Sequence, residues 1–120
     1  MMKALLIVAH GSRRAASNDE VRELTARIRD LAGTRFGQVD CAFLELAEPS
    51  IPDGIECCVR NGADEVVVLP YFLSAGRHVI SDIPGEVEGK QQQYPDVNIH
   101  IVPYLGSAES IPELMLQLAS

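Results

Sequence analysis

Two short, uninterrupted apolar runs, each followed by a histidine, most constrain the fold of this chain. Leu5–Ala9 leads directly into His10, and Val66–Leu69 is followed by Pro70 and a polar turn that ends at His78. Apolar runs of this length without polar alternation are typical of strands covered on both faces, as in parallel sheets. Pro70 ends the second run because proline cannot donate to a central ladder. The sequence therefore predicts inner parallel strands with a histidine beyond the ends of two of them.

Helical patterns alternate with four strand candidates along the chain. The predicted strands are residues 3–9, 39–46, 65–69 and 97–102. Capping boxes at 17–20 and 110–113 predict the starts of the first and last helices, and Ser50 is the expected cap of the second. The third helix is expected after a loop that reaches Arg77, and to end at Tyr94. Apolar side chains share one face of the last helix: Ile111, Leu114, Met115 and Leu118.

This alternation predicts a single α/β domain spanning residues 1–120. Short connections between strands and helices favour one four-stranded parallel sheet with helices on both faces, a three-layer α/β/α sandwich. A chain of 120 residues, 47% of them apolar, is long enough for one such core. We assume the flavodoxin-like strand order 2-1-3-4.

Charge and composition exclude several classes of function. The net charge of −7 disfavours nucleic acid as a partner, since nucleic-acid binders are more often basic. No apolar run approaches the length of a membrane span, and no signal-peptide pattern precedes the first strand. Cys41, Cys57 and Cys58 form no CxxC pair and are expected to be reduced thiols. These features predict a cytoplasmic protein without membrane or nucleic-acid partners.

Three potential ligands or bases converge at one edge of the predicted sheet. Ligands of open α/β sheets bind beyond the carboxyl ends of the strands, where the strand order reverses. His10 and His78 follow the two strands that flank this reversal, and Glu45 lies near the end of the neighbouring strand. Each of these residues could instead have a purely structural role. A histidine here could simply bond a loop carbonyl, and the glutamate could simply be solvated. His100, in the middle of the last strand, is expected to be structural.

Two imidazoles and a carboxylate suit two kinds of chemistry. They bind borderline divalent cations such as Co²⁺, Ni²⁺ or Fe²⁺. They also accept protons near neutral pH. Insertion of a metal into a tetrapyrrole needs both, because the ring loses two pyrrole protons as the metal enters. Either histidine could do either job.

Polar residues in the same loops indicate an anionic ligand. On an acidic chain, arginines gathered at one edge of a sheet favour carboxylate or phosphate groups on the ligand. Alternatively, they are solvated surface charges. The candidate substrate-binding residues are Ser12, Arg13, Arg14, Ser74 and Arg77.

Five short motifs are spread along the sequence. They are AHGS at 9–12, FLE at 43–45, PYFLSAGRH at 70–78 followed by DIP at 82–84, and PYLG at 103–106. Their combination resembles the CbiX/SirB family of sirohydrochlorin chelatases over essentially the whole chain. The resemblance implies a chelatase-like fold and no permanent cofactor. It also implies insertion of Co²⁺ or Fe²⁺ into sirohydrochlorin, in cobalamin or siroheme biosynthesis, with Ni²⁺ as a further possible metal.

The resemblance also implies roles for particular residues. His10 and His78 match the two metal-site histidines of the family and Glu45 its acidic partner, so all three are candidate catalytic residues. Many chelatases of this group have two lobes, whereas short members resemble one lobe that pairs with itself. A symmetric homodimer is therefore expected. The alternatives are a metal or tetrapyrrole carrier without turnover, and a nucleotide or flavin module whose phosphate cradle is the loop after Ala9.

Overall fold

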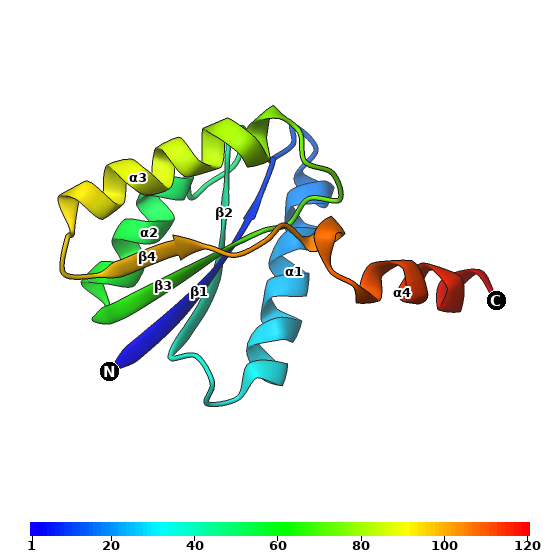
Figure 1. Cartoon of the computed structure of the whole chain (residues 1–120), viewed down its shortest axis with the longest axis horizontal. Helices are drawn as coiled ribbons and strands as arrows, with labels where there is room; N and C mark the ends of the chain where they lie inside the picture. Colours follow the sequence, from blue (N-terminus) through cyan, green and yellow to red (C-terminus); the bar gives the residue numbers. More distant parts are fainter.

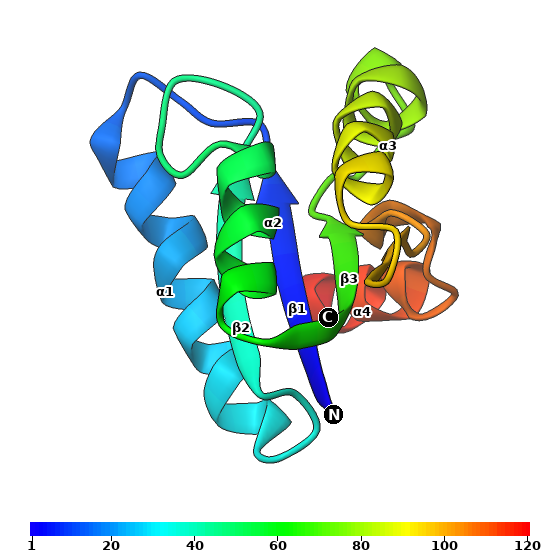
Figure 2. The same cartoon turned by 90° about the vertical axis from the view of Figure 1, so that its left-hand side faces the viewer.

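A fully parallel sheet of four strands forms the centre of the molecule in the computed structural model, which describes residues 1–120 (Figure 1). The strand order is β2-β1-β3-β4, as assumed from the sequence, and Figure 2 shows β2, β1 and β3 side by side in this order. The strands are β1 (Met2–Ala9), β2 (Gln38–Phe43), β3 (Ala63–Pro70) and β4 (Asn98–Ile101). The predicted fold class is confirmed. Because β1 pairs with both β2 and β3, it lies at the point where strand order reverses.

Helices cover both faces of the sheet. Figure 1 shows α2 (Ile51–Arg60) and α3 (Ile83–Gln93) on one side of the strands and α1 (Ala15–Ala32) on the other. Alternate residues of β1 enter the two cores, which explains its continuous apolar sequence. Leu6 and Val8 join the core under α2 and α3, and Leu5 and Ile7 join the core under α1.

The helix caps agree only in part with the capping patterns in the sequence. At α2 the prediction is confirmed, because the Ser50 hydroxyl accepts a hydrogen bond from the Asp53 N–H at 3.2 Å. At α1 the predicted capping box at 17–20 is wrong, since the helix begins at Ala15. Asn18 is buried there, where its side chain accepts from the Ser12 N–H and donates to the Ser12 carbonyl, at 2.9 and 2.8 Å. The capping box at 110–113 is also wrong, because no side chain caps α4 (Ser110–Ala119).

The second strand is shorter than the sequence suggests. It ends at Phe43 rather than at Leu46, whose φ of 66° is incompatible with a strand. The Leu44 N–H still donates to the Ala9 carbonyl at 3.0 Å, so the chain stays beside β1 as it turns. Glu45 consequently lies in a loop next to the end of β1.

The last helix covers neither face of its own sheet. Figure 1 shows α4 extending away from the body, beyond α1 and ending at the C-terminus. The molecule measures 47 × 31 × 27 Å, and α4 accounts for its length. Three helices therefore form the two outer layers, and the fourth projects. None of the helices combines the length and apolar character needed to cross a bilayer.

Candidate active site

His10 lies at the carboxyl end of β1, where the backbone brings it against the loop after β2. The Glu45 N–H donates to the His10 carbonyl at 3.1 Å. Gly11 permits this approach, because a Cβ on it would lie 1.8 Å from the Glu45 carbonyl oxygen. Its φ of +96° also favours glycine. The sequence His-Gly thus positions the histidine and the glutamate together through backbone contacts.

His78 begins a single π-helical turn, η1 (His78–Asp82), between the loop after β3 and α3. The Ile83 N–H donates to the His78 carbonyl, which is the wide i to i+5 bond of such a turn. The Asp82 carboxylate lies 2.6 Å from His78 Nδ1. π-Helical turns within α-helices occur frequently at functional sites. The loop ends at Arg77 as predicted, but the regular helix begins only at Ile83.

The two histidines meet. Their ring centroids are 4.6 Å apart and the rings are perpendicular. Glu45 Oε1 lies 2.9 Å from His10 Nε2. The four side chains thus form a continuous series, Glu45–His10–His78–Asp82, which we call the active-site row. The structure brings together the three residues expected from the sequence.

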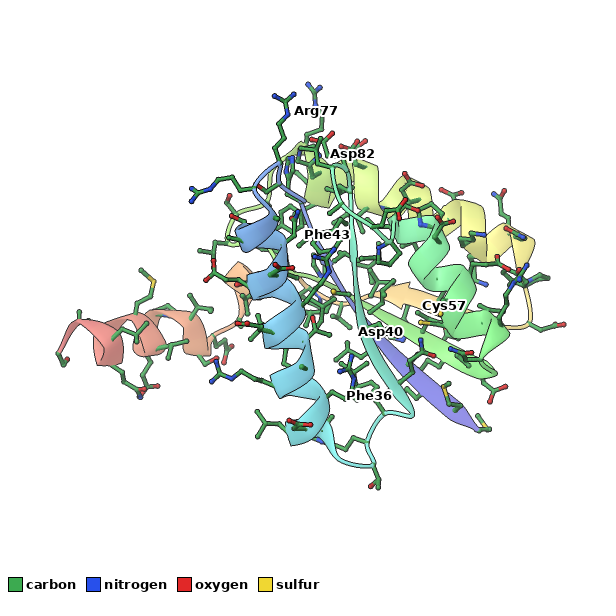
Figure 3. The ribbon with its side chains drawn as sticks, turned by 180° about the vertical axis from the view of Figure 1, so that it is seen from behind. Phe36, Asp40, Phe43, Cys57, Arg77 and Asp82 are labelled. Carbon is green, nitrogen blue, oxygen red and sulfur yellow. The ribbon has the colours of Figure 1, made fainter.

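Asp82 is the member of the row that the site prediction missed. Its place in the DIP motif carried no role, yet it is the fourth residue after His78. That spacing places two side chains on the same face of a helix, which is the signal that could have identified it. Figure 3 shows Asp82 and Arg77 at the same end of the molecule, with Arg77 projecting outward.

The hydrogen bonds assign the tautomers of both histidines. An ionised carboxylate only accepts hydrogen bonds, so the ring hydrogens lie on His10 Nε2 and His78 Nδ1. The available lone pairs are then on His10 Nδ1 and His78 Nε2. Both rings remain accessible, with side chains 46% and 39% exposed. One imidazole can therefore bind a cation while the other accepts a proton.

A cavity of about 390 Å³ adjoins the row. Its walls carry Glu45, Asp82 and Glu86, and this acidic lining suits a cation. The remaining lining residues are Leu44, His78, Ser81 and Gly85. No group of three or more His, Cys, Asp or Glu side chains is arranged as a ready metal site. Such an open arrangement differs from the closed four-ligand geometry of a structural metal site.

The side chains of the predicted substrate-binding residues differ in how exposed they are and in whether they already have a bonding partner. Arg13, Arg14 and Arg77 are exposed, and none of them forms an ion pair. Ser74 is also exposed. Ser12 is half-buried, and its hydroxyl accepts from the Arg14 N–H at 3.0 Å.

The loop after Ala9 is not arranged as a phosphate cradle. Such a cradle needs free backbone N–H groups that point at the anion. The Ser12 N–H donates to Asn18 and the Arg14 N–H donates to the Ser12 hydroxyl, so two of these groups are already bonded. The nucleotide or flavin alternative therefore loses its binding element.

His100 lies apart from the row, as expected. Its Nε2 is 2.7 Å from a carboxylate oxygen of Glu65, which makes a pair between β4 and β3. Both side chains belong to the middle or beginning of their strands, not to the carboxyl ends. This third histidine is a natural control for the other two.

Comparison with known proteins identifies the family of this chain. The model of the CbiX family matches residues 4–120. A sirohydrochlorin ferrochelatase of Arabidopsis thaliana, described as chloroplastic, is 39% identical over 102 residues, which are 85% of this chain and 44% of that protein. A sirohydrochlorin cobaltochelatase of Sulfurisphaera tokodaii is 30% identical over 114 residues, covering 95% of this chain and 88% of that protein.

A solved structure has the same fold. The structure of SirB from Bacillus subtilis with Fe³⁺ superposes with a TM-score of 0.85 at 32% identity, over 98% of this chain and 46% of that chain. This chain thus spans less than half the length of SirB and of the plant protein. The match of the family model over almost the whole sequence, together with the shared fold, leads to one conclusion: the chain belongs to the CbiX family.

Proposed function

We propose that this protein is a metal chelatase that inserts Co²⁺ or Fe²⁺ into sirohydrochlorin, on the way to cobalamin or siroheme. The relatives carry both activities in their names, so the family supports the reaction and leaves both metals open. The observation that carries the proposal is the active-site row, in which two imidazoles meet between two carboxylates. The metal and the tetrapyrrole are the substrates, and Ni²⁺ is a further metal that two imidazoles can bind.

Each histidine has one carboxylate partner and one free ring nitrogen, and we assign metal binding to His78 and proton transfer to His10. His78 presents Nε2 as a metal ligand while Asp82 fixes the ring through Nδ1, the arrangement that metal-binding histidines commonly adopt. His10 presents Nδ1 as a proton acceptor, and Glu45 stabilises the imidazolium that forms. Each insertion releases two pyrrole protons and places one divalent ion in the ring. His10 takes one of these protons at a time and passes it to solvent.

The exposed arginines bind the acidic substituents of the tetrapyrrole. Arg13, Arg14 and Arg77 follow the same strands as the histidines and have no carboxylate partner within the chain. Guanidinium groups recognise carboxylates through paired hydrogen bonds. Ser74 adds an exposed hydroxyl in the loop before Arg77, and Ser12 contributes by fixing the Arg14 backbone.

We further propose that the working unit is a symmetric homodimer in the cytoplasm. One copy offers an open site, and a flat tetrapyrrole needs two walls, so a second copy completes the cleft. Three unpaired cysteines agree with a reducing compartment.

Metal insertion measured anaerobically tests the reaction. The purified protein is mixed with sirohydrochlorin and Co²⁺ or Fe²⁺, absorbance is followed, and the uncatalysed rate is subtracted. The His10→Ala, His78→Ala double variant should lose the acceleration, and His100→Ala should retain it. A wild-type rate no faster than that of the double variant would reject the proposal.

A carrier that binds metal or tetrapyrrole without turnover is the second candidate. The proximity of the two imidazoles also fits it, because the same pair that would deliver a metal could hold it without turnover. Stoichiometric binding with no acceleration, in a preparation whose dimer is intact, would select this function over the first.

A further inference from the structure

The loop that carries Glu45 has hydrogen bonds at its two ends. It comprises residues 44–49, between β2 and α2, and we call it the Glu45 loop. At its start, the N–H groups of Leu44 and Glu45 donate to carbonyls at the end of β1, at 3.0 and 3.1 Å. At its end, the Pro49 carbonyl accepts from the Phe43 N–H at 2.9 Å. The stretch between these contacts must be held in another way.

Residues 46–48 donate no hydrogen bond through their backbone N–H groups. The one backbone group of this stretch that has a partner is the Glu48 carbonyl, which accepts from Arg22 Nη2 at 3.0 Å. Packing adds little, because Ala47 alone packs against the core and a cavity of about 360 Å³ lies beside Pro49. Arg22, a residue of α1, is therefore the hydrogen-bond donor that secures the middle of the loop.

Arg22 is itself fixed by contacts on several sides. Its Nη1 donates to Asp19 Oδ1 at 3.0 Å, one turn earlier on the same helix. Its guanidinium carbon lies 5.2 Å from the centre of the Phe43 ring, and that ring is fully buried. A planar group with several N–H donors can make these contacts and still reach the Glu48 carbonyl, whereas a compact ammonium cannot. In Figure 2 the Glu45 loop curves toward the first turns of α1, where Arg22 lies.

We infer that Arg22 is a positioning residue, which holds the Glu45 loop so that the Glu45 carboxylate meets His10. The Glu45 side chain is 56% exposed and bonds only to His10, at 2.9 Å, so its place depends on where the loop is held. Exposed ion pairs such as Arg22–Asp19 contribute little to global stability, so stability does not account for this contact. The inference rests on the proposed function, in which Glu45 stabilises the imidazolium of His10.

Losing the anchor affects the rate through the position of one carboxylate. Exposed loops with few buried contacts open locally at a small cost in free energy. Without the bond to Arg22, the loop spends more time in conformations in which Glu45 does not face His10. Displacing a catalytic group by a fraction of its contact distance slows the reaction, even when the change lies far from the chemistry.

Kinetics of Arg22→Met test the effect on the rate. Methionine keeps an apolar side chain over the Phe43 ring and removes the donors to Asp19 and Glu48. The kcat of metal insertion should fall about tenfold, as expected when a charged hydrogen bond that positions a catalytic group is lost. KM for sirohydrochlorin and the Tm should stay close to the wild-type values.

Arg27→Met is the matched control, because Arg27 is an exposed arginine of the same helix without an ion pair. It should leave kcat unchanged. A loss of kcat in Arg27→Met as large as in Arg22→Met would mean that any arginine of α1 affects the rate, and would overturn the assignment of Arg22.

A double variant separates positioning from a general loss of structure. In a Glu45→Gln background the carboxylate is gone, so adding Arg22→Met should lower the residual kcat no further. A second loss of the same size would mean that Arg22 acts by a route other than Glu45, and would overturn the inference.

Hydrogen exchange followed by NMR tests the anchor without turnover. The Leu44 and Glu45 amides, which bond to the end of β1, should exchange about tenfold faster in Arg22→Met and at the wild-type rate in Arg27→Met. Unchanged exchange in Arg22→Met overturns the inference, and so does faster exchange with a normal kcat. A wild type that does not accelerate insertion rejects the chelatase proposal instead, and the exchange rates still decide whether Arg22 holds the loop.

Discussion

At the scale of single residues, Asp82 determines which nitrogen of His78 is free. The ionised carboxylate accepts from Nδ1 at 2.6 Å, and this leaves the Nε2 lone pair available to a metal. An asparagine at the same position can present its amide N–H instead. The histidine would then accept at Nδ1 and carry its hydrogen on Nε2, where it blocks coordination. Asp82 is therefore a positioning residue, acting through His78.

Asp82→Asn should lower metal affinity about 10- to 100-fold, the usual cost of losing a carboxylate behind a ligating histidine. Titration calorimetry with Co²⁺ measures this directly, and KM for sirohydrochlorin should not change. Glu86→Gln is the matched control, because Glu86 lines the same cavity without bonding a histidine. Equal Co²⁺ affinity in wild type and Asp82→Asn would contradict the role.

Gly11 is the residue on which the pairing of His10 with Glu45 depends. Gly11→Ala should destabilise the fold by at least about 2 kcal/mol, because the methyl group meets the Glu45 carbonyl in a strained backbone conformation. Urea denaturation measures the loss, and the insertion rate should fall with it. Gly89→Ala should not destabilise, since a Cβ there meets nothing within 4 Å and α3 favours alanine. A Gly11→Ala variant as stable as the wild type would mean that the two loops can separate freely.

At the scale of elements, Glu56 joins α2 to α3. Its carboxylate accepts from Lys90 Nζ at 2.8 Å, from the Tyr94 hydroxyl at 2.6 Å and from Arg60 Nε at 2.9 Å. Hydrogen bonding to Lys90 is the main reason that the pKa of Glu56 falls from 4.5 to about 2, with Tyr94 and Arg60 adding to it. A lowered carboxyl pKa stabilises the fold fully above the unfolded value. That stabilisation is lost as the pH falls from about 4.5 toward 2.

Glu56→Gln should therefore lower the Tm at pH 7, and the difference from wild type should shrink as the pH falls from 4.5 toward 2. Thermal unfolding followed by circular dichroism at a series of pH values measures it. Glu88→Gln, an exposed change on α3, should leave the Tm unchanged at every pH. A difference between wild type and Glu56→Gln that does not vary with pH would argue against the charged contact.

The arrangement of strands and helices explains which parts of the site could be predicted from the sequence. Parallel strands align their carboxyl ends, so alternating strands and helices, together with the assumed strand order, predicted that His10, Glu45 and His78 lie together. The cap at Ser17 failed because a neighbour, Asn18, bonds to the backbone of Ser12, a contact that local pattern does not encode. Asp82 stands four residues after His78, a spacing that indicates one helix face, but the π-helical turn that carries the pair follows from no pattern in the sequence.

At the scale of the whole molecule, α4 shows the limit of local reasoning. The sequence predicts one apolar face for this helix, but it does not predict that the helix extends away from the sheet. Helical spacing identifies which face is buried but not what buries it. The 3₁₀ turn at Leu105–Ser107, just before α4, lies against the loop after β3, where a Cβ on Gly106 would meet the carbonyl of Leu73, thirty-three residues earlier in the chain.

The distribution of charge over the whole molecule leads to the last prediction. The net charge is −7, which repels an anionic substrate at a distance, so attraction must come from a local basic group. In the proposed site Arg13, Arg14 and Arg77 supply that group, since they are exposed and form no ion pair within the chain. Replacing all three with glutamine should raise KM for sirohydrochlorin about tenfold, the sum expected of three exposed charge contacts. The kcat should change little, since none of the three reaches the histidines through a hydrogen bond.

Varying the salt concentration distinguishes the loss of charge in the triple variant from a change in the shape of the binding site. Raising the salt concentration from about 0.02 to 0.5 M should increase KM in the wild type, because screening weakens exposed contacts. The triple variant should show a much smaller increase, since the charges that salt screens are gone. Arg27→Gln is the control, as Arg27 is an exposed arginine of α1 without an ion pair and should leave the salt dependence intact. If the triple variant responded to salt as strongly as the wild type, the attraction would have to come from charges elsewhere on the surface.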